Sequence, residues 1–167
     1  YLGAFIISLM IEELWFDEKF LKIRDDSDLN FRIRQSGGIV IVDSGIQVQH
    51  FPRESFRAFV KLCFNYGFGR GLFFMKHKQF SAIRQFVLPF IFLMGMILLV
   101  SGFFYPLLHL VLLGGALTYL ILTSIVSVGL TESGGKEILY MMSCFIGCHI
   151  FWTLGFYKGV ILYGVNK

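Results

Sequence analysis

The sequence predicts an α/β layer over residues 1–52, a basic helical segment over 53–85 and about three membrane helices over 86–167. Two observations lead to this prediction. The chain of 167 residues has a mean hydropathy of +0.69 and only 16% charged residues, which is too apolar for an ordinary soluble domain. The charge is also uneven, because residues 1–85 hold 12 of the 15 Lys and Arg and 9 of the 11 Asp and Glu.

Strand and helix patterns alternate in the first 52 residues. We expect, in order, a buried strand at Gly3–Ser8, a helical turn at 9–15, a loop at 16–20, a helix that ends at Gly37 and Gly38, and strands at Ile39–Val42 and Ile46–His50. β-Branched residues fill Ile39–Val42 and alternate with glutamine at the start of Ile46–His50, and a turn at Asp43–Gly45 separates the two segments. This order of elements is typical of an α/β layer.

The helix of this layer has its own start and stop signals. Asp26 or Ser27 could cap its first turn, and the glycines at 37 and 38 suit a left-handed stop. Leu29, Phe31 and Ile33 supply its apolar faces. Asp28 and Arg32 are four residues apart, so we expect them to form an ion pair.

Residues 53–85 combine aromatic and basic residues at helical spacing. Pro52 opens this segment, and Phe56, Phe59, Val60, Cys63 and Tyr66 recur along one face, with Arg53, Arg57 and Lys61 between them. Such a helix suits the membrane surface, although the surface helix of a soluble domain would show the same pattern.

Three uncharged stretches follow, at about 86–105, 107–130 and 138–157. Each reaches the length of about 20 residues that a bilayer core requires. We expect a turn at Pro106 to join the first two as a hairpin, and a polar loop at Thr131–Glu137 to precede the third.

The basic residues indicate the orientation of these spans. Arg70, Lys76, Lys78 and Arg84 come just before the first span, which favours the cytoplasmic side for this segment. A full third span would put Lys158 and Lys167 outside, so the end of that segment could lie in the membrane interface instead.

The cysteines and two histidines predict packing rather than chemistry. Cys63, Cys144 and Cys148 show no disulfide or metal spacing, and Cys144 and Cys148 share a helix face in an apolar run. His109 and His149 also lie in apolar runs and are expected to pack between helices.

The charge that stands out is the acidic run Asp25-Asp26-Ser27-Asp28. It can be explained by helix capping and the helix dipole alone. Three crowded carboxylates also repel one another, and such crowding is common where a carboxylate acts as a base or faces a metal ion. Residue chemistry therefore leaves two readings open, a helix cap and an acid–base or metal site to which His50 could contribute.

The order "GAF", "FDEKF", "DDSDLNFRIRQSGG" and "IQVQHFPRESF" resembles the C-terminal half of a family 2 glycosyltransferase catalytic domain of the GT-A fold. That family usually shows Glu-Asp-x-Asp-Leu followed by Arg and Gly, and Asp25 stands here where the family has Glu. "HFPRESF" and "FNYGFGRG" followed by membrane helices are similar to bacterial exopolysaccharide enzymes of the succinoglycan type. The resemblance covers about residues 1–78.

The resemblance implies an inverting transfer from a nucleotide-sugar donor to a lipid-linked or saccharide acceptor. Asp26 matches the family's catalytic base, with Asp25 beside it, and His50 matches a histidine that helps to hold a divalent metal, Mg²⁺ or Mn²⁺. The remaining implied contacts are acceptor binding by Gly3, Ala4, Phe5 and Asp28, and phosphate or headgroup contact by Arg53, Tyr66 and Arg70.

The same resemblance implies that half of the active site is missing. The nucleotide-binding strands and the Asp-x-Asp metal motif should precede this segment, so we expect a C-terminal fragment that is inactive alone. The absence of a Gln-x-x-Arg-Trp signature favours addition of a single sugar over polymerisation. The implied location is the plasma membrane, with the catalytic part in the cytoplasm and no nucleic-acid partner. The alternative is a non-catalytic membrane protein, such as a transporter subunit or assembly factor that reuses the fold.

Overall fold

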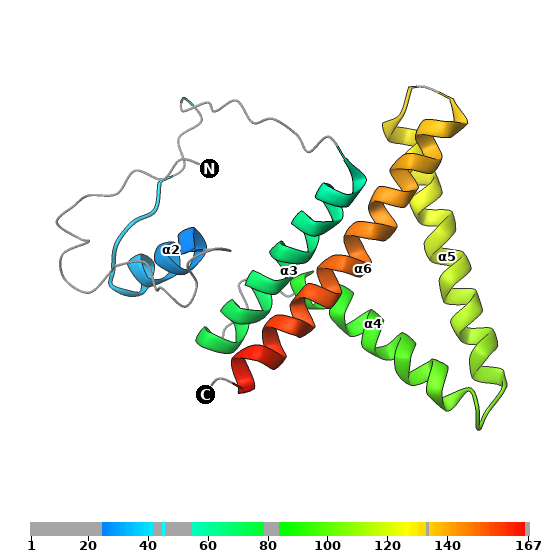
Figure 1. Cartoon of the computed structure of the whole chain (residues 1–167), viewed down its shortest axis with the longest axis horizontal. Helices are drawn as coiled ribbons and strands as arrows, with labels where there is room; N and C mark the ends of the chain where they lie inside the picture. Colours follow the sequence, from blue (N-terminus) through cyan, green and yellow to red (C-terminus); the bar gives the residue numbers. More distant parts are fainter. Residues whose placement is uncertain (1–24, 42–44, 46–54, 79–83, 133, 166–167) are drawn as a thin grey trace. The chain divides into compact units, whose positions relative to one another are not determined.

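The computed structural model of the chain describes residues 25–41, 45, 55–78, 84–132 and 134–165. The chain divides into two compact units, Tyr1–Glu54 and Ser55–Lys167. The first contains helix α2 (Asp25–Gln35). The second contains α3 (Phe56–His77), α4 (Arg84–Ser101), α5 (Leu107–Leu130) and α6 (Gly135–Val165), as labelled in Figure 1.

The predicted α/β layer of the GT-A type is wrong, because the regular elements in the described residues are all α-helices. Ile39–Ile41, expected to be a strand, forms no strand, and Ile39 and Ile41 are 84% and 82% exposed. β-Branched residues favour a strand only where a partner strand and a packed face are present, and the described residues provide neither for this segment. The strands expected at Gly3–Ser8 and Ile46–His50 lie outside the described residues.

The membrane helices agree only in part with the predicted spans. Helix α5 has the predicted bounds, and it and α6 are long and apolar enough to cross a bilayer. Helix α4 ends at Ser101 instead of Tyr105, and its 18 residues reach about 27 Å, less than a hydrocarbon core of about 30 Å. Helix α6 has 31 residues because it starts within the predicted polar loop and continues beyond Tyr157, through Gly159 and Gly164, to Val165.

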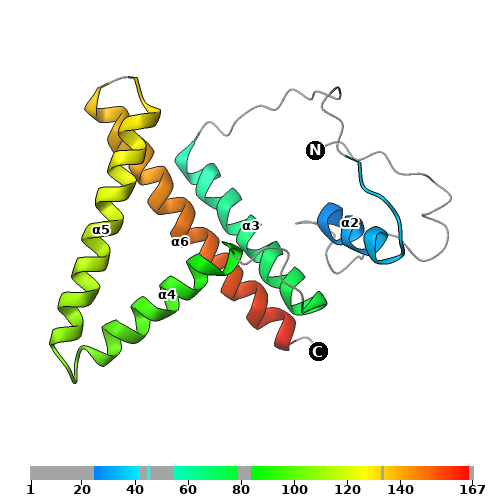
Figure 2. The same cartoon turned by 180° about the vertical axis from the view of Figure 1, so that it is seen from behind.

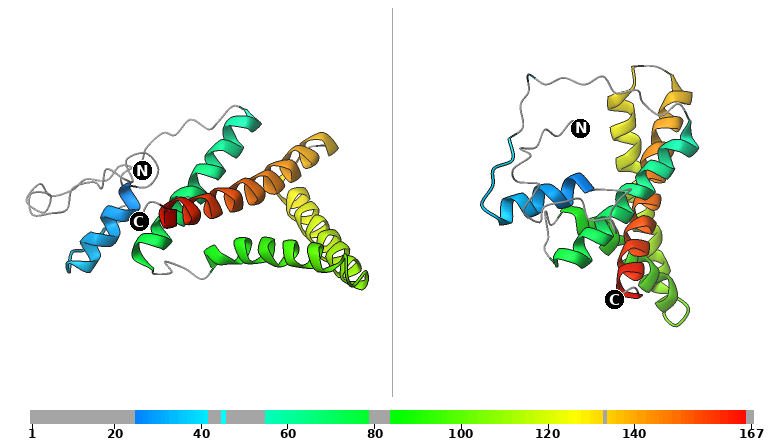
Figure 3. Two further views of the ribbon diagram at one scale, coloured as in Figure 1. Left: turned by 60° about the horizontal axis from the view of Figure 1, so that its bottom comes forward. Right: turned by 60° about the vertical axis from the view of Figure 1, so that its left-hand side comes forward.

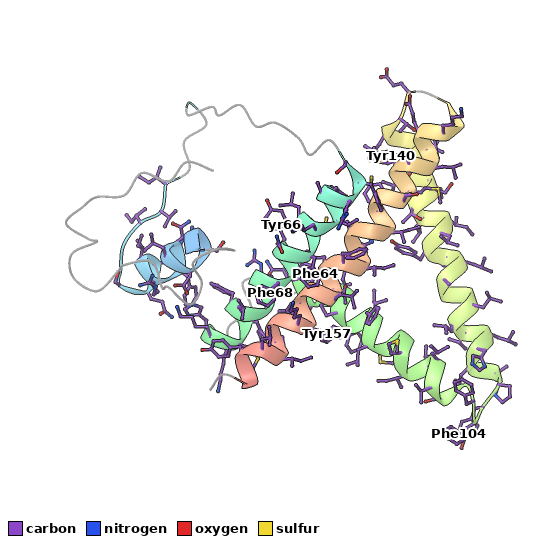
Figure 4. The ribbon with its side chains drawn as sticks, viewed as in Figure 1. Phe64, Tyr66, Phe68, Phe104, Tyr140 and Tyr157 are labelled. Atoms are coloured by element: carbon purple, nitrogen blue, oxygen red, sulfur yellow. The ribbon has the colours of Figure 1, made fainter. Side chains whose placement is uncertain are left out.

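Gly102 and Pro106 shape the turn that joins α4 to α5. A side chain at Gly102 would collide with the imidazole of His109, so a glycine lets the ring pack there. Pro106 precedes the first residue of α5, where a missing N–H costs nothing. The ring of Phe103 also meets His109 edge-on, with centroids 6.0 Å apart, and Figure 4 shows Phe104 at the tip of this turn. His109 is thus a packing residue, as predicted.

Helices α3 and α6 lie side by side along most of α3, and the views from front, back and side agree (Figures 1, 2 and 3). The contact depends on glycines. Side chains at Gly67 and Gly71 would meet the backbone of α6, and side chains at Gly155 and Gly159 would meet the backbone of α3. Both pairs have the Gly-x-x-x-Gly spacing that allows helix backbones to approach closely.

Helix α3 starts later than Pro52 predicted. Ser55 is its N-cap, and its Oγ accepts a hydrogen bond from the Ala58 N–H at 3.2 Å. The helix ends at His77, and Lys78 is its C-cap, with a left-handed φ of 49° and an N–H that donates to the Phe74 carbonyl at 2.8 Å. The segment predicted as one helical region therefore breaks before α4.

Few contacts hold α4 and α5 to the rest of the unit. The Tyr157 hydroxyl on α6 donates to the carbonyl of Pro89 on α4 at 2.6 Å. Phe86 meets Phe156 edge-on, with ring centroids 5.5 Å apart. On α5, Ser127 is fully buried and its hydroxyl donates to the Thr123 carbonyl at 2.7 Å, so a polar group is satisfied within an apolar helix.

Most of the apolar surface of α4 and α5 remains exposed. Phe90 and Ile91 of α4 are 62% and 59% exposed, and Ile121 and Ile125 of α5 are 60% and 63% exposed. Contiguous exposed apolar surface on this scale indicates a membrane or a protein partner. Residues 86–131 carry no Asp, Glu, Lys or Arg, which favours hydrocarbon.

The glycine contact predicts a sharp difference between two conservative substitutions. Gly155→Ala puts a methyl group against the Phe64 carbonyl, whereas Gly115→Ala meets nothing within 4 Å. We expect the first to lower the free energy of unfolding by about 1–3 kcal/mol. The second should change little or add helix stability of up to about 1 kcal/mol. Titration of the detergent-solubilised chain with SDS, followed by circular dichroism, measures both. Equal stability of the two variants would contradict the close approach of α3 and α6.

Candidate functional site

Helix α2 begins at the acidic run, so Asp25 and Asp26 form its first turn. The prediction that Asp26 or Ser27 caps the helix is wrong, because the helix already includes both residues. Free backbone N–H groups and the positive end of the helix dipole favour carboxylates at this position. The first turn of α2 is therefore a favourable place for negative charge.

Asp28 has a structural role that the sequence predicted in part. The Arg32 Nε donates to Asp28 Oδ2 at 3.0 Å, which confirms the expected ion pair. The pair is not exposed, since the Asp28 side chain is 1% accessible and that of Arg32 is 20%. Leu29 and Ile33 are buried beside it along the helix. The carboxylate of Asp28 is thus held within the folded unit, and acceptor binding by Asp28 stays a prediction.

The C-terminus of α2 has the predicted left-handed stop. Gly37 has φ of 85°, its N–H donates to the Arg34 carbonyl at 3.2 Å, and the Gly38 N–H donates to the Ile33 carbonyl at 2.8 Å. This pattern is a Schellman motif. A side chain at Gly38 would also collide with Ile33, so both glycines are needed.

The other predicted site residues divide between two groups. Tyr66 and Arg70 lie one turn apart on α3, in the second unit; Tyr66 is 48% exposed, and the Arg70 guanidinium lies 6.0 Å from the Phe73 ring centroid. The residues outside the described part of the chain are Gly3, Ala4, Phe5, His50 and Arg53.

The described residues bring no predicted metal site together. Among them, no three His, Cys, Asp or Glu side chains are close enough to hold a metal ion. The predicted ligand His50 lies outside this set. The contribution of His50 to a metal site therefore stays a prediction.

One polar contact between the apolar helices was missed by sequence reasoning. The hydroxyl of Tyr119 on α5 and Nδ1 of His149 on α6 are 2.8 Å apart. His149 also packs near Phe145, with ring centroids 6.5 Å apart, in line with its predicted packing role. The two residues are 30 positions apart, so no local pattern could indicate the pair. The Gly-x-x-x-Gly repeats of α3 and α6, in contrast, were visible in the sequence.

The comparisons with known proteins returned nothing: no family model, no curated protein and no solved structure matches the chain.

The buried ion pair of α2 predicts unequal roles for two neighbouring arginines. Arg32→Gln leaves the Asp28 carboxylate without its guanidinium, whereas Arg34 is exposed, so Arg34→Gln serves as the control. We expect Arg32→Gln to cost about 1.5–3 kcal/mol of local stability, the range for a hydrogen bond to a charged group. Arg34→Gln should stay within about 0.5 kcal/mol. Hydrogen–deuterium exchange of the α2 amides measures the free energy of opening. Unchanged protection in Arg32→Gln would show that the pair contributes no net stability.

Proposed function

We propose that the chain is the membrane-bound C-terminal part of an inverting glycosyltransferase that adds one sugar to a lipid-linked or saccharide acceptor in surface polysaccharide or glycolipid synthesis. The observation that supports this proposal most is the run Asp25-Asp26-Ser27-Asp28-Leu29 with Arg32 and Gly37 downstream. Its helical setting is consistent with the proposal, since the run forms the start of α2 and the glycine terminates it.

The three aspartates have different proposed roles. Asp28 is engaged by Arg32 in the buried pair. Asp26 is the proposed general base, which takes the proton of the acceptor hydroxyl as that oxygen attacks the anomeric carbon. The nucleotide diphosphate leaves from the opposite face, so the configuration at that carbon inverts. Asp25 lies next to Asp26 in the first turn and is proposed to face the acceptor.

The membrane helices suggest where this reaction takes place. Helices α5 and α6 are long and apolar enough to cross a bilayer. We propose a multi-pass plasma-membrane protein whose acidic helix lies in the cytoplasm, where nucleotide-sugars are supplied. In this proposal a donor-binding half outside the given sequence holds most of the divalent metal, with His50 contributing, and the chain alone is expected not to transfer sugar.

A second candidate is a non-catalytic membrane protein, such as a transporter subunit or assembly factor. The contact between Tyr119 and His149 favours it, because ionisable residues within membrane helices often have a functional role. Both residues also pack between helices, which explains the contact without transport.

The proposal predicts that Asp26→Asn abolishes most of the activity of the full-length enzyme. Asparagine keeps the size of aspartate but cannot accept the proton at neutral pH, so transfer should fall by about 10²–10⁴-fold. Transfer from a nucleotide-sugar is measured in membranes at matched expression, and hydrogen exchange of α2 serves as the folding control. Near-normal transfer by Asp26→Asn would exclude Asp26 as the general base. The acidic run would then serve only to stabilise the N-terminus of α2.

The proposal also predicts the side of the membrane on which α3 ends. Arg70, Lys76 and Lys78 precede an uncharged stretch, so this segment should be cytoplasmic. A reporter enzyme that is active only outside the cytoplasm, inserted after Lys78, should be inactive. Strong reporter activity there would reverse the orientation and remove access to cytoplasmic donors.

A further inference from the structure

The alignment of α3 with α6 determines where the charges of α3 lie. The two helices run in the same direction: Phe56 and Val60 contact Gly147, and Phe64 and Phe68 meet Gly155. In Figure 4, Phe64 and Phe68 can be followed along α3. The start of α3 therefore lies beside the middle of α6.

This alignment conflicts with a path of α6 straight across the bilayer. Gly147 lies three residues, about 4.5 Å along the axis, from the midpoint of the 31-residue α6, so in a crossing helix it would lie near the centre of a core about 30 Å thick. Arg57 and Lys61 are both exposed and would then lie in the hydrocarbon, near Gly147 and one turn beyond it. Charged side chains at that depth are costly. The helix pair needs another orientation, in which these charges reach a polar layer.

The cations form one flank of the pair, which we call the basic flank and define as Arg57, Lys61 and Lys158. The Lys158 ammonium lies 5.6 Å from the centroid of the Phe64 ring, and Lys61 precedes Phe64 by one turn. All three basic side chains are exposed. The sequence holds no Asp or Glu from Ser55 to Thr131, so neither α3 nor the α4–α5 hairpin supplies an anion for this flank.

A different face of α6 is apolar and also exposed. Leu139, Ile150, Leu154 and Ile161 recur at helical spacing and are 65%, 43%, 41% and 62% exposed. The α3–α6 pair thus presents an apolar face next to a cationic flank. This combination is typical of helices that lie in the membrane interface, with the apolar side in the acyl chains and the cations among phosphates.

We propose that α3 and α6 lie together along the cytoplasmic membrane surface, with the basic flank bound to the phosphate groups of anionic phospholipids, and that α6 does not cross the bilayer. In this arrangement the chain crosses the bilayer along α4 and returns to the cytoplasmic side along α5. This arrangement keeps Lys136 and Lys158 on the side of α3, as the positive-inside rule favours. The proposal rests on the membrane association proposed above and not on sugar transfer.

The depth of Trp152 tests the orientation. Trp152 lies near the centre of the 31-residue α6, so a crossing helix would put it at the bilayer centre. The full chain carrying Trp15→Phe has Trp152 as its single tryptophan. It is reconstituted in vesicles of phosphatidylcholine and phosphatidylglycerol that carry bromine near the headgroup or near the chain ends. Headgroup-side bromine should quench Trp152 more strongly. Stronger quenching by the deep bromine would overturn the proposal, and no quenching by either would overturn membrane association itself.

The lipid partner is tested by a matched pair of double variants. The quenching of Trp152 fluorescence is measured with either brominated phosphatidylglycerol or brominated phosphatidylcholine. Brominated phosphatidylglycerol should quench more strongly, because the basic flank should gather anionic lipid around the helix pair. Lys61→Gln with Lys158→Gln should lower this preference by up to about fivefold for each charge, equal to about 1 kcal/mol. Lys61→Arg with Lys158→Arg keeps the charges and should keep the preference. Equal quenching by both lipids in the unchanged chain would overturn the assignment to anionic phospholipid.

A reporter at the C-terminus gives an independent readout. An enzyme active only outside the cytoplasm, fused after Lys167, should be inactive, whereas the same enzyme inserted after Tyr105 at the hairpin should be active. Activity at both positions would mean that α6 crosses the membrane.

Discussion

The close approach of α3 and α6 is the contact on which the second unit depends. Backbone meets backbone at Gly67, Gly71, Gly155 and Gly159, so the distance between the helices is set by atoms that cannot move aside. Dispersion contacts of this kind do not need water to drive them, and they operate in lipid as well as in a soluble core. Helices α4 and α5 have no comparable contact and join the pair through a few polar and aromatic contacts.

The charged residues of the two units differ in where their counter-charges lie. In α2, the Asp28 carboxylate is buried, and the Arg32 guanidinium neutralises it within the same helix. Such a pair is costly to break from the arginine side, because the Asp28 carboxylate is buried, whereas Arg32 is partly exposed. In α3, the exposed cations Arg57 and Lys61 have no acidic residue on their own helix, so their counter-charges must come from elsewhere. The proposed binding to a surface rich in phosphate would supply them.

The polar groups within the apolar helices are satisfied locally or in pairs. The hydroxyls of Thr123, Ser127 and Thr131 each donate to the carbonyl four residues earlier. Tyr119 and His149 pair across two helices, and Tyr157 uses the carbonyl of Pro89. Because unsatisfied polar groups are expensive in an apolar medium, these contacts explain how hydroxyl and imidazole groups are accommodated there.

The sequence by itself determined the local features of the chain. The bounds of α5, the ion pair of Asp28 and Arg32, and the left-handed stop at Gly37 follow from composition, spacing and backbone preference within a few residues. The tertiary structure decided what depends on distant partners. Ile39–Ile41 forms no strand despite its β-branched residues, Asp28 is buried and not exposed, and α3 packs along α6. Strand pairing, burial and helix contacts join residues far apart in the chain, and no local pattern contains that information.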